Sequence, residues 1–167
     1  MSTVAWDGKS LAADRRQTQA NVMTKSWKIT RMADGAVAAI VGDIGKGRVL
    51  LAWYDDGADP DKWPQALQTE EGFSPLILAD TQMLVEFENL AVPLVYPRSQ
   101  KMAWGSGHQI ALGAMAAGAT AAEAVKIASQ YDIYTGHGVD TMEPEGRVLA
   151  DALAWGIVTQ SRVKRRK

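Results

Sequence analysis

Short apolar runs separated by turn residues dominate the first half of the chain. They predict three β-hairpins, which pair residues 4–6 with 11–13, residues 27–32 with 36–41, and residues 76–79 with 83–87. Asp-Gly turns join the first two pairs. The near-continuous apolarity of residues 36–41 predicts a strand that is buried on both faces.

The rest of the chain mixes strand and helix patterns. Residues 15–25 are polar and lack glycine, so we expect a loop or irregular edge there. Further strands are expected at residues 91–96, 101–104, 131–135 and 139–142, the first of them at a sheet edge because it contains proline. Apolar spacing and capping residues predict helices at residues 44–54, 110–117, 120–130 and 147–158, and a short helical turn at residues 61–67.

Strands and helices come in runs rather than in strict alternation, which argues for an α+β fold with antiparallel sheets. Two such sheets stacked face to face, with helices outside, would accommodate this order. We divide the chain into a main domain, residues 1–142, and a C-terminal helix with a basic tail, residues 143–167.

Composition narrows the classes of function. Of the 167 residues, 47% are apolar and 22% are charged, as in a globular domain, and the net charge of −1 gives no argument for nucleic-acid binding. The absence of cysteine excludes disulfides and thiol catalysis, and 2 histidines without cysteine do not make a zinc site. Because the sequence has no leader and no long apolar run, we expect a cytoplasmic protein that does not enter a membrane.

The first hairpin brings a carboxylate to the start of the chain. A three-residue loop would pair Ser2 with Asp14, whereas a two-residue loop would pair Ser2 with Ala13. We expect Ser2 to be the first mature residue, because initiator Met is removed before a small residue. Its α-amine, with a pKa of about 7.7–8.0, could then accept the proton of its own hydroxyl. The alternative is a frayed terminus in front of a strand.

Five short motifs, taken together and in order, resemble those of proteasome β-type subunits, above all the bacterial HslV-type peptidases and their phage-borne relatives. The resemblance covers about residues 2–142 and implies a four-layer αββα sandwich of the N-terminal-nucleophile hydrolases. The motifs are Ser2-Thr3-Val4-Ala5-Trp6 with Ala12-Ala13-Asp14, Lys28-Ile29-Thr30-Arg31-Met32, Ile40-Val41-Gly42-Asp43, Gly105-Ser106-Gly107 and Asp132-Ile133-Tyr134-Thr135-Gly136-His137.

The resemblance implies a role for each matched residue near the nucleophile. The family's nucleophile is Thr, whereas this chain has Ser2 and then Thr3, so both stay open. Asp14 would orient a catalytic lysine, which is Lys28, with Lys25 as the rival if the register slips. The backbone N–H of Gly42 would bind the oxyanion, and a side chain there would block the substrate.

A second set of residues would complete the network around the amine. The resemblance places Ser106, Asp132 and Thr135 in it, although Ser106 could equally be the N-cap of the helix that follows. In HslV-type enzymes, backbone carbonyls near here also hold a cation. By position these would be the carbonyls of Ser129, Asp132 and Thr135, and the ion would be a structural Na or Mg ion, with no cofactor required.

The resemblance therefore implies a peptidase that cleaves peptides or unfolded proteins. Its subunits would form a homo-oligomeric ring, with hexamers or heptamers as the family's forms and an ATPase unfoldase as a partner to look for. The alternative is a subunit that builds rings without cleaving, which the Ser-for-Thr departure and Asp43 beside the oxyanion site support. We rate a nucleic-acid role for the basic tail, residues 162–167, lowest, because such a tail is usually solvated.

Overall fold

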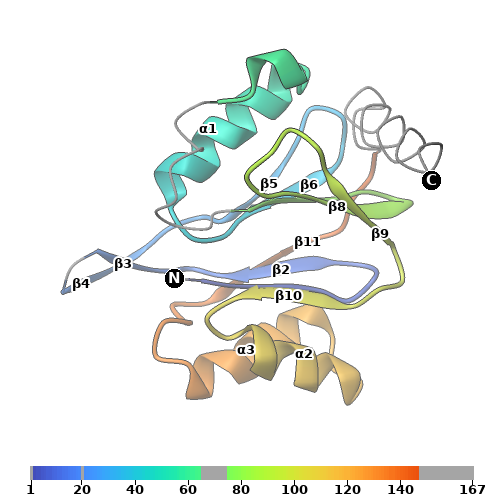
Figure 1. Ribbon diagram of the computed structural model, residues 1–167. Coiled ribbons are helices and arrows are strands. Elements are labelled where there is room, and N and C mark those ends of the chain that lie inside the picture. The colour runs from blue at the N-terminus through green and yellow to red at the C-terminus, as the bar shows by residue number, and fades with distance from the viewer. Residues whose placement is uncertain (1, 20, 65–74, 147–167) are drawn as a thin grey trace, which may run out of the picture.

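The computed structural model describes residues 2–19, 21–64 and 75–146. Two antiparallel sheets lie between layers of helix, so four layers follow one another from top to bottom in Figure 1. The α+β class and the αββα sandwich are both confirmed. The helix predicted at residues 147–158 lies outside the described residues, and the division at residue 142 stays a prediction.

One sheet contains the N-terminal hairpin. In the order β10-β1-β2-β11, its strands are β10 (Met102–Gly105), β1 (Thr3–Trp6), β2 (Leu11–Asp14) and β11 (Val139–Met142). The prediction of a strand at residues 131–135 is wrong. The chain turns after Asp132 instead, because the side chain of Asp132 accepts the N–H of Tyr134 and its carbonyl accepts the N–H of Thr135.

The first hairpin has a longer loop than either predicted register allows. Trp6 is paired with Leu11, and the side chain of Asp7 holds the loop by accepting backbone N–H groups within it. Both predicted registers are therefore wrong, since an aspartate-capped turn replaced the tighter one. When the observed register is continued, Thr3 rather than Ser2 falls opposite Asp14.

The other sheet is formed by the next two hairpins and an edge strand. In the order β5-β6-β7-β8-β9, its strands are β5 (Ile29–Arg31), β6 (Val37–Ile40), β7 (Leu76–Ala79), β8 (Met83–Phe87) and β9 (Leu94–Pro97). These hairpins and the edge position of β9 are confirmed. All residues of β6 are buried, as its apolar run predicted.

A separate two-stranded ribbon extends from the side of the sandwich, at the left of Figure 1. Its strands are β3 (Arg16–Gln19) and β4 (Val22–Lys25). The prediction of a loop or irregular edge at residues 15–25 is therefore wrong, because two regular strands form there. The side chains of β4 are all exposed and those of β3 are at most partly buried, so no apolar alternation marked these strands in the sequence.

The helices cover the two outer faces of the sandwich. They are α1 (Ile44–Asp55), α2 (His108–Ala116) and α3 (Ala121–Tyr131), and a short 3-10 helix, η1, spans Pro60–Lys62. The capping box of Thr120 and Glu123 is confirmed at α3. The alternative role of Ser106, as the N-cap of α2, is wrong, because Gly107 occupies that position without a side-chain hydrogen bond.

Three apolar clusters hold the layers together. One packs α1 against the five-stranded sheet around Leu50 and Phe87, and another packs α2 and α3 against the four-stranded sheet around Met115. The third fills the space between the sheets and includes Trp6 and Trp104. Because strand side chains alternate between faces, each position on β1 belongs either to the inter-sheet core or to the helix side.

Candidate active site

The alternation along β1 separates the two hydroxyl residues at the start of the chain. Val4 packs between the sheets, whereas Ala5 packs against α2 and α3. By the same period of two, Ser2 belongs to the face of Val4, and Thr3 belongs to the opposite face. The two hydroxyls therefore meet different surroundings.

Thr3 is enclosed on the helix side. Its residue is 0% exposed, its Oγ1 accepts the N–H of Gly107 at 3.0 Å, and it lies 2.5 Å from Thr135 Oγ1. A hydroxyl held in this way is already occupied by structural hydrogen bonds.

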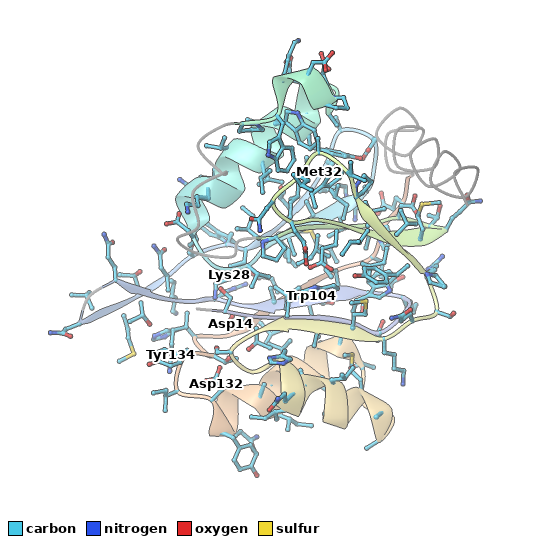
Figure 2. All side chains as sticks on the ribbon, in the orientation of Figure 1. Asp14, Lys28, Met32, Trp104, Asp132 and Tyr134 are labelled. Carbon is cyan, nitrogen blue, oxygen red and sulfur yellow. The ribbon has the colours of Figure 1, made fainter. Side chains whose placement is uncertain are left out.

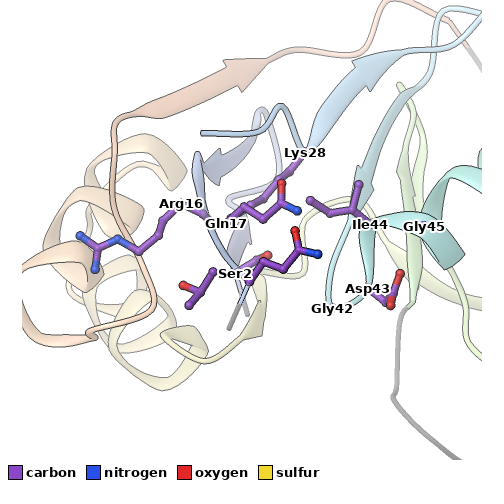
Figure 3. Close-up of a pocket in the computed structure, with 10 residues that line it drawn as sticks. Ser2, Arg16, Gln17, Lys28, Gly42, Asp43, Ile44 and Gly45 are labelled. Carbon is purple, nitrogen blue, oxygen red and sulfur yellow. Dashed lines mark hydrogen bonds between the residues drawn. The ribbon is translucent and has the colours of Figure 1, made fainter. Parts of the chain in front are cut away.

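Ser2 instead lines a cavity of about 280 Å³ together with Lys28 and Gly42 (Figure 3). The other walls come from β3 (residues 16–19) and from residues 43–45 at the start of α1. Ser2 is only 2% exposed, so this residue is part of the cavity wall and not of the outer surface. The structure thus brings together the three residues that sequence reasoning assigned to nucleophile, lysine and oxyanion site.

Lys28 and Asp14 form a buried ion pair between the sheets (Figure 2). Lys28 Nζ lies 2.7 Å from Asp14 Oδ1, and the two side chains are 1% and 0% exposed. Nζ also donates to the carbonyl of Arg16 at 2.5 Å. Burial lowers the pKa of the Lys28 ammonium below its usual value, and the nearby Asp14 carboxylate only partly opposes this effect. The rival Lys25 is exposed on β4 and does not line this cavity.

Asp14 is the organising acceptor of the site. Besides the lysine, it accepts the backbone N–H of Thr3 at 2.8 Å, of Arg16 at 2.9 Å and of Gly136 at 3.0 Å. A buried carboxylate that accepts this many hydrogen bonds fixes the strand ends around it. The start of β1, the start of β3 and the turn before β11 are therefore tied to one side chain.

Gly42 and Asp43 form the corner between β6 and α1. Gly42 has φ of +85°, a left-handed conformation that favours glycine, and it lies beside Ser2 at the cavity wall. Asp43 is the N-cap of α1, and its Oδ1 accepts the N–H of Lys46 at 3.0 Å. The Asp43 carboxylate is therefore committed to the helix terminus, which weakens the objection that it opposes an oxyanion at Gly42.

Ser106, Asp132 and Thr135 form a hydrogen-bonded cluster on the helix side of Ser2. Asp132 Oδ2 accepts from Ser106 Oγ at 2.6 Å and from Thr135 Oγ1 at 2.5 Å. Burial raises the pKa of the Asp132 carboxyl, but these hydrogen bonds and the N–H of Tyr134 outweigh it, so the pKa lies below its usual value. The Ser106 N–H donates to the Ser2 carbonyl at 2.9 Å, which connects the cluster to Ser2.

The carbonyls expected to hold a cation lie at the end of α3 and in the following turn. The carbonyl of Asp132 accepts the N–H of Thr135 at 3.1 Å, which leaves it one lone pair for an ion. Among the described residues, no group of three His, Cys, Asp or Glu residues could hold a metal. That finding concerns side chains, so the Na or Mg site at Ser129, Asp132 and Thr135 stays a prediction.

Four residues have roles in the site that were not identified from the sequence, although three of them stood in its motifs. Arg16 supplies both a carbonyl to Lys28 and an N–H to Asp14, Gly136 donates to Asp14, and Thr3 joins the helix-side cluster. Gly105 has φ of +89°, and a Cβ there would lie 1.7 Å from the Ser2 carbonyl oxygen. Most of these contacts are made by the backbone, which residue type does not reveal; only the glycines carried a signal.

No family model matches the sequence, and no curated protein sequence matches it. In the described residues, no helix is both long and apolar enough to span a membrane. The fold, however, is similar to solved structures. Eukaryotic HslV from Trypanosoma brucei is 18% identical, with 84% of this chain and 97% of that chain covered and a TM-score of 0.66.

Thiobacillus denitrificans BPH gives a similar result. It is 20% identical, with 86% of this chain and 98% of that chain covered and a TM-score of 0.64. Its complex with epoxomicin is 18% identical with the same coverage, 86% and 98%, and a TM-score of 0.61. At these identities the likeness concerns the fold, and the fold that the sequence resemblance implied is confirmed: this chain has the HslV fold.

Proposed function

We propose that this protein is a peptidase that uses Ser2 as an N-terminal nucleophile once Met1 has been removed. One observation carries the proposal: Ser2, Lys28 and Gly42 line a single cavity, and Lys28 is held there by the buried Asp14. The fold likeness to HslV and to a protein solved with epoxomicin supports the same reading.

In the proposed mechanism, Ser2 supplies both nucleophile and base. Its α-amine takes the proton of the hydroxyl, and Oγ forms a bond to the carbonyl carbon of the substrate. The Lys28 ammonium stabilises the oxygen as it loses its proton, and the N–H of Gly42 binds the oxyanion. Ser106 and Asp132 hold the amine on the other side of the residue.

The intermediate then collapses to an ester. The bond between carbonyl carbon and amide nitrogen breaks, and the protonated amine of Ser2 gives its proton to the leaving nitrogen. Water subsequently attacks the ester, again with the amine as base, and restores the hydroxyl. A free N-terminus is therefore a chemical requirement, because an amide nitrogen cannot take part in these transfers.

The experiment is a peptidase assay on two forms of the full chain. The form with Met1 removed should cleave unfolded protein or peptide, and a form with a noncleavable N-terminal extension should not. A noncleaving mature chain with an intact fold would instead favour the alternative, a ring-forming subunit without activity. Equal cleavage by both forms would contradict the mechanism.

Assembly into a homo-oligomeric ring is part of the proposal. Apolar side chains are exposed on the ribbon and next to it, with Val22 61%, Met23 59% and Trp27 79% exposed, and Tyr131 and Ile133 at the end of α3 are more than 70% exposed. Such exposure is typical of a surface that is covered by a partner. Size exclusion with light scattering should give a mass well above the 18.0 kDa of one chain; a single species near that mass would contradict it. An ATPase unfoldase that feeds the ring would be a further partner.

A further inference from the structure

A second cavity, of about 460 Å³, adjoins the candidate nucleophile. It shares Ser2 and Gly42 with the first cavity, and its remaining wall includes Val41, Ala103 and Trp104. His108 also lines it and is itself exposed. Ser2 thus lies at the junction of two cavities, as expected where one bound chain is cut into two parts.

The two cavities differ in chemistry. The first has the polar side chains of Gln17, Thr18, Gln19 and Lys28 along it. The second is walled mainly by an indole, a valine and an alanine, which disfavour a charged side chain because a charge loses its hydration there. The protein would therefore prefer different substrate side chains on the two sides of the scissile bond.

The proposed proton transfer decides which part of the substrate occupies which cavity. The leaving nitrogen must lie on the side of the terminal amine, because the amine protonates it. Ser106, which the proposal places beside that amine, lines the second cavity and not the first. Lys28 lines the first and not the second. The leaving part of the substrate thus belongs in the second cavity.

Trp104 is held in place by a buried carboxyl from the other sheet. Trp104 Nε1 on β10 donates to Glu86 Oε1 on β8 at 3.0 Å, and the hydroxyl of Tyr96 on β9 donates to Glu86 Oε2 at 3.2 Å. Glu86 is 4% exposed, and Figure 2 shows Trp104 in the interior between the sheets.

The mechanism makes no use of Glu86. Burial raises its pKa above the usual value despite these two hydrogen bonds. A protonated carboxyl still offers a carbonyl oxygen to the indole N–H, so the contact holds in either state. Glu86 therefore fixes the indole at the cavity wall independently of its charge.

We propose that the second cavity is a specificity subsite for an apolar side chain on the residue just after the scissile bond, with Trp104 as its wall and Glu86 as the residue that positions Trp104. This inference rests on the proposed function and names the substrate preference of that site. Glu86 is a positioning residue, because it would act on the substrate only through Trp104.

The test compares two peptides that differ only in the residue after the cut, Leu in one and Asp in the other. Wild-type protein should cleave the Leu peptide with a kcat/KM about tenfold or more above that for the Asp peptide. In parallel, a small β-lactone acylates the hydroxyl of Ser2 without releasing a leaving group. The rate of acylation by the lactone therefore measures the reactivity of Ser2 and does not depend on a leaving group in the second cavity.

The variants distinguish whether Glu86 positions Trp104 for substrate selection or only stabilises the fold. Trp104→Ala and Glu86→Ala should reduce the Leu-over-Asp ratio to about threefold or less, through KM. The lactone rate of each variant measures separately how far the substitution has disturbed the nucleophile. Glu86→Gln should keep the ratio, because its amide oxygen still accepts the indole N–H. Leu112→Ala, on an exposed part of α2, is the matched control and should change neither readout.

Each outcome decides between the claims. Wild-type protein that reacts with the lactone but cleaves both peptides equally would overturn the subsite and leave the proposed function standing. An unchanged ratio in Trp104→Ala would do the same. If Glu86→Ala fails to fold, Trp104→Phe decides the role of the N–H: a lowered ratio supports positioning by Glu86, and an unchanged ratio overturns it. No reaction with lactone or peptide would overturn the proposed function and the subsite together.

Discussion

The backbone N–H of Thr3 donates to Asp14 Oδ1 at 2.8 Å, and the same oxygen accepts from Lys28 Nζ at 2.7 Å. This contact fixes the backbone of Thr3 beside the ion pair. Because neighbouring side chains on a strand point to opposite faces, it also leaves Ser2 on the face of the cavity. The proposal of Ser2 rather than Thr3 as nucleophile thus rests on the alternation of side chains along β1.

Substitution of the two hydroxyl residues should have opposite effects on activity and stability. Ser2→Ala should abolish cleavage and keep the fold, whereas Ser2→Thr should preserve cleavage. Thr3→Ala should retain cleavage but cost about 1–3 kcal/mol of unfolding free energy, because it leaves the buried N–H of Gly107 unpaired. Peptide cleavage and urea unfolding measure both quantities. Loss of turnover in a folded Thr3→Ala protein, with turnover kept in Ser2→Ala, would assign the nucleophile to Thr3.

Removal of either member of the buried ion pair should lower turnover. Lys28→Ala should do so by about 10²-fold, as expected for a group that tunes a general-base network. It should also destabilise the fold by about 3–5 kcal/mol, because the Asp14 carboxylate loses its cation. Asp14→Asn should have a similar effect, since an amide NH₂ would face the donors around it. Lys25→Ala, at the exposed lysine on β4, is the control and should change neither quantity.

The activity should depend on pH through two groups. The α-amine of Ser2 must be neutral to act as base, so kcat/KM should rise with pH through about 7.7–8.0. Lys28 must be charged, and its pKa lies below the ordinary 10.5. Activity should therefore fall again at alkaline pH, as the Lys28 ammonium loses its proton. In Lys28→Arg the alkaline fall should disappear, because arginine stays charged. An identical alkaline limb in that variant would remove Lys28 from the mechanism.

Asp7 should matter for stability rather than for activity. Its carboxylate accepts N–H groups of the first hairpin loop and the N–H of Ala121 at the start of α3. Burial raises its pKa, but these hydrogen bonds outweigh it, so the pKa lies below 3.8. A carboxyl with a lowered folded-state pKa stabilises the protein above pH 3.8, and this contribution is lost as pH falls through the folded value. Asp7→Ala should therefore destabilise at pH 7 and flatten the acid dependence of urea unfolding; an unchanged dependence would contradict this role.

The parts of the fold that the sequence predicted are those with strong local signals. The apolar run of β6, the capping box of α3 and the three hairpins all had such signals. The ribbon of β3 and β4 did not, because its residues show no alternation of apolar and polar positions. Its position nevertheless matters, since Arg16 on β3 contacts both Asp14 and Lys28.

The candidate site was predicted by residue type but not by geometry. Ser2, Asp14 and Lys28 were identified from the sequence, yet both expected pairings of Ser2, with Asp14 or with Ala13, were wrong. Asp7 caused the shift by holding a longer loop with its own carboxylate. A turn dipeptide such as Asp7-Gly8 does not specify these side-chain contacts. The register of the first hairpin therefore could not be predicted from the sequence.

Mass spectrometry of the full chain after reaction with a β-lactone shows whether Ser2 is a free N-terminal nucleophile. We predict an intact mass that lacks Met1 and gains one lactone, with the adduct mapped to Ser2 and absent from Ser2→Ala. A chain that retains Met1 and still reacts, or an adduct mapped to Thr3, would contradict it.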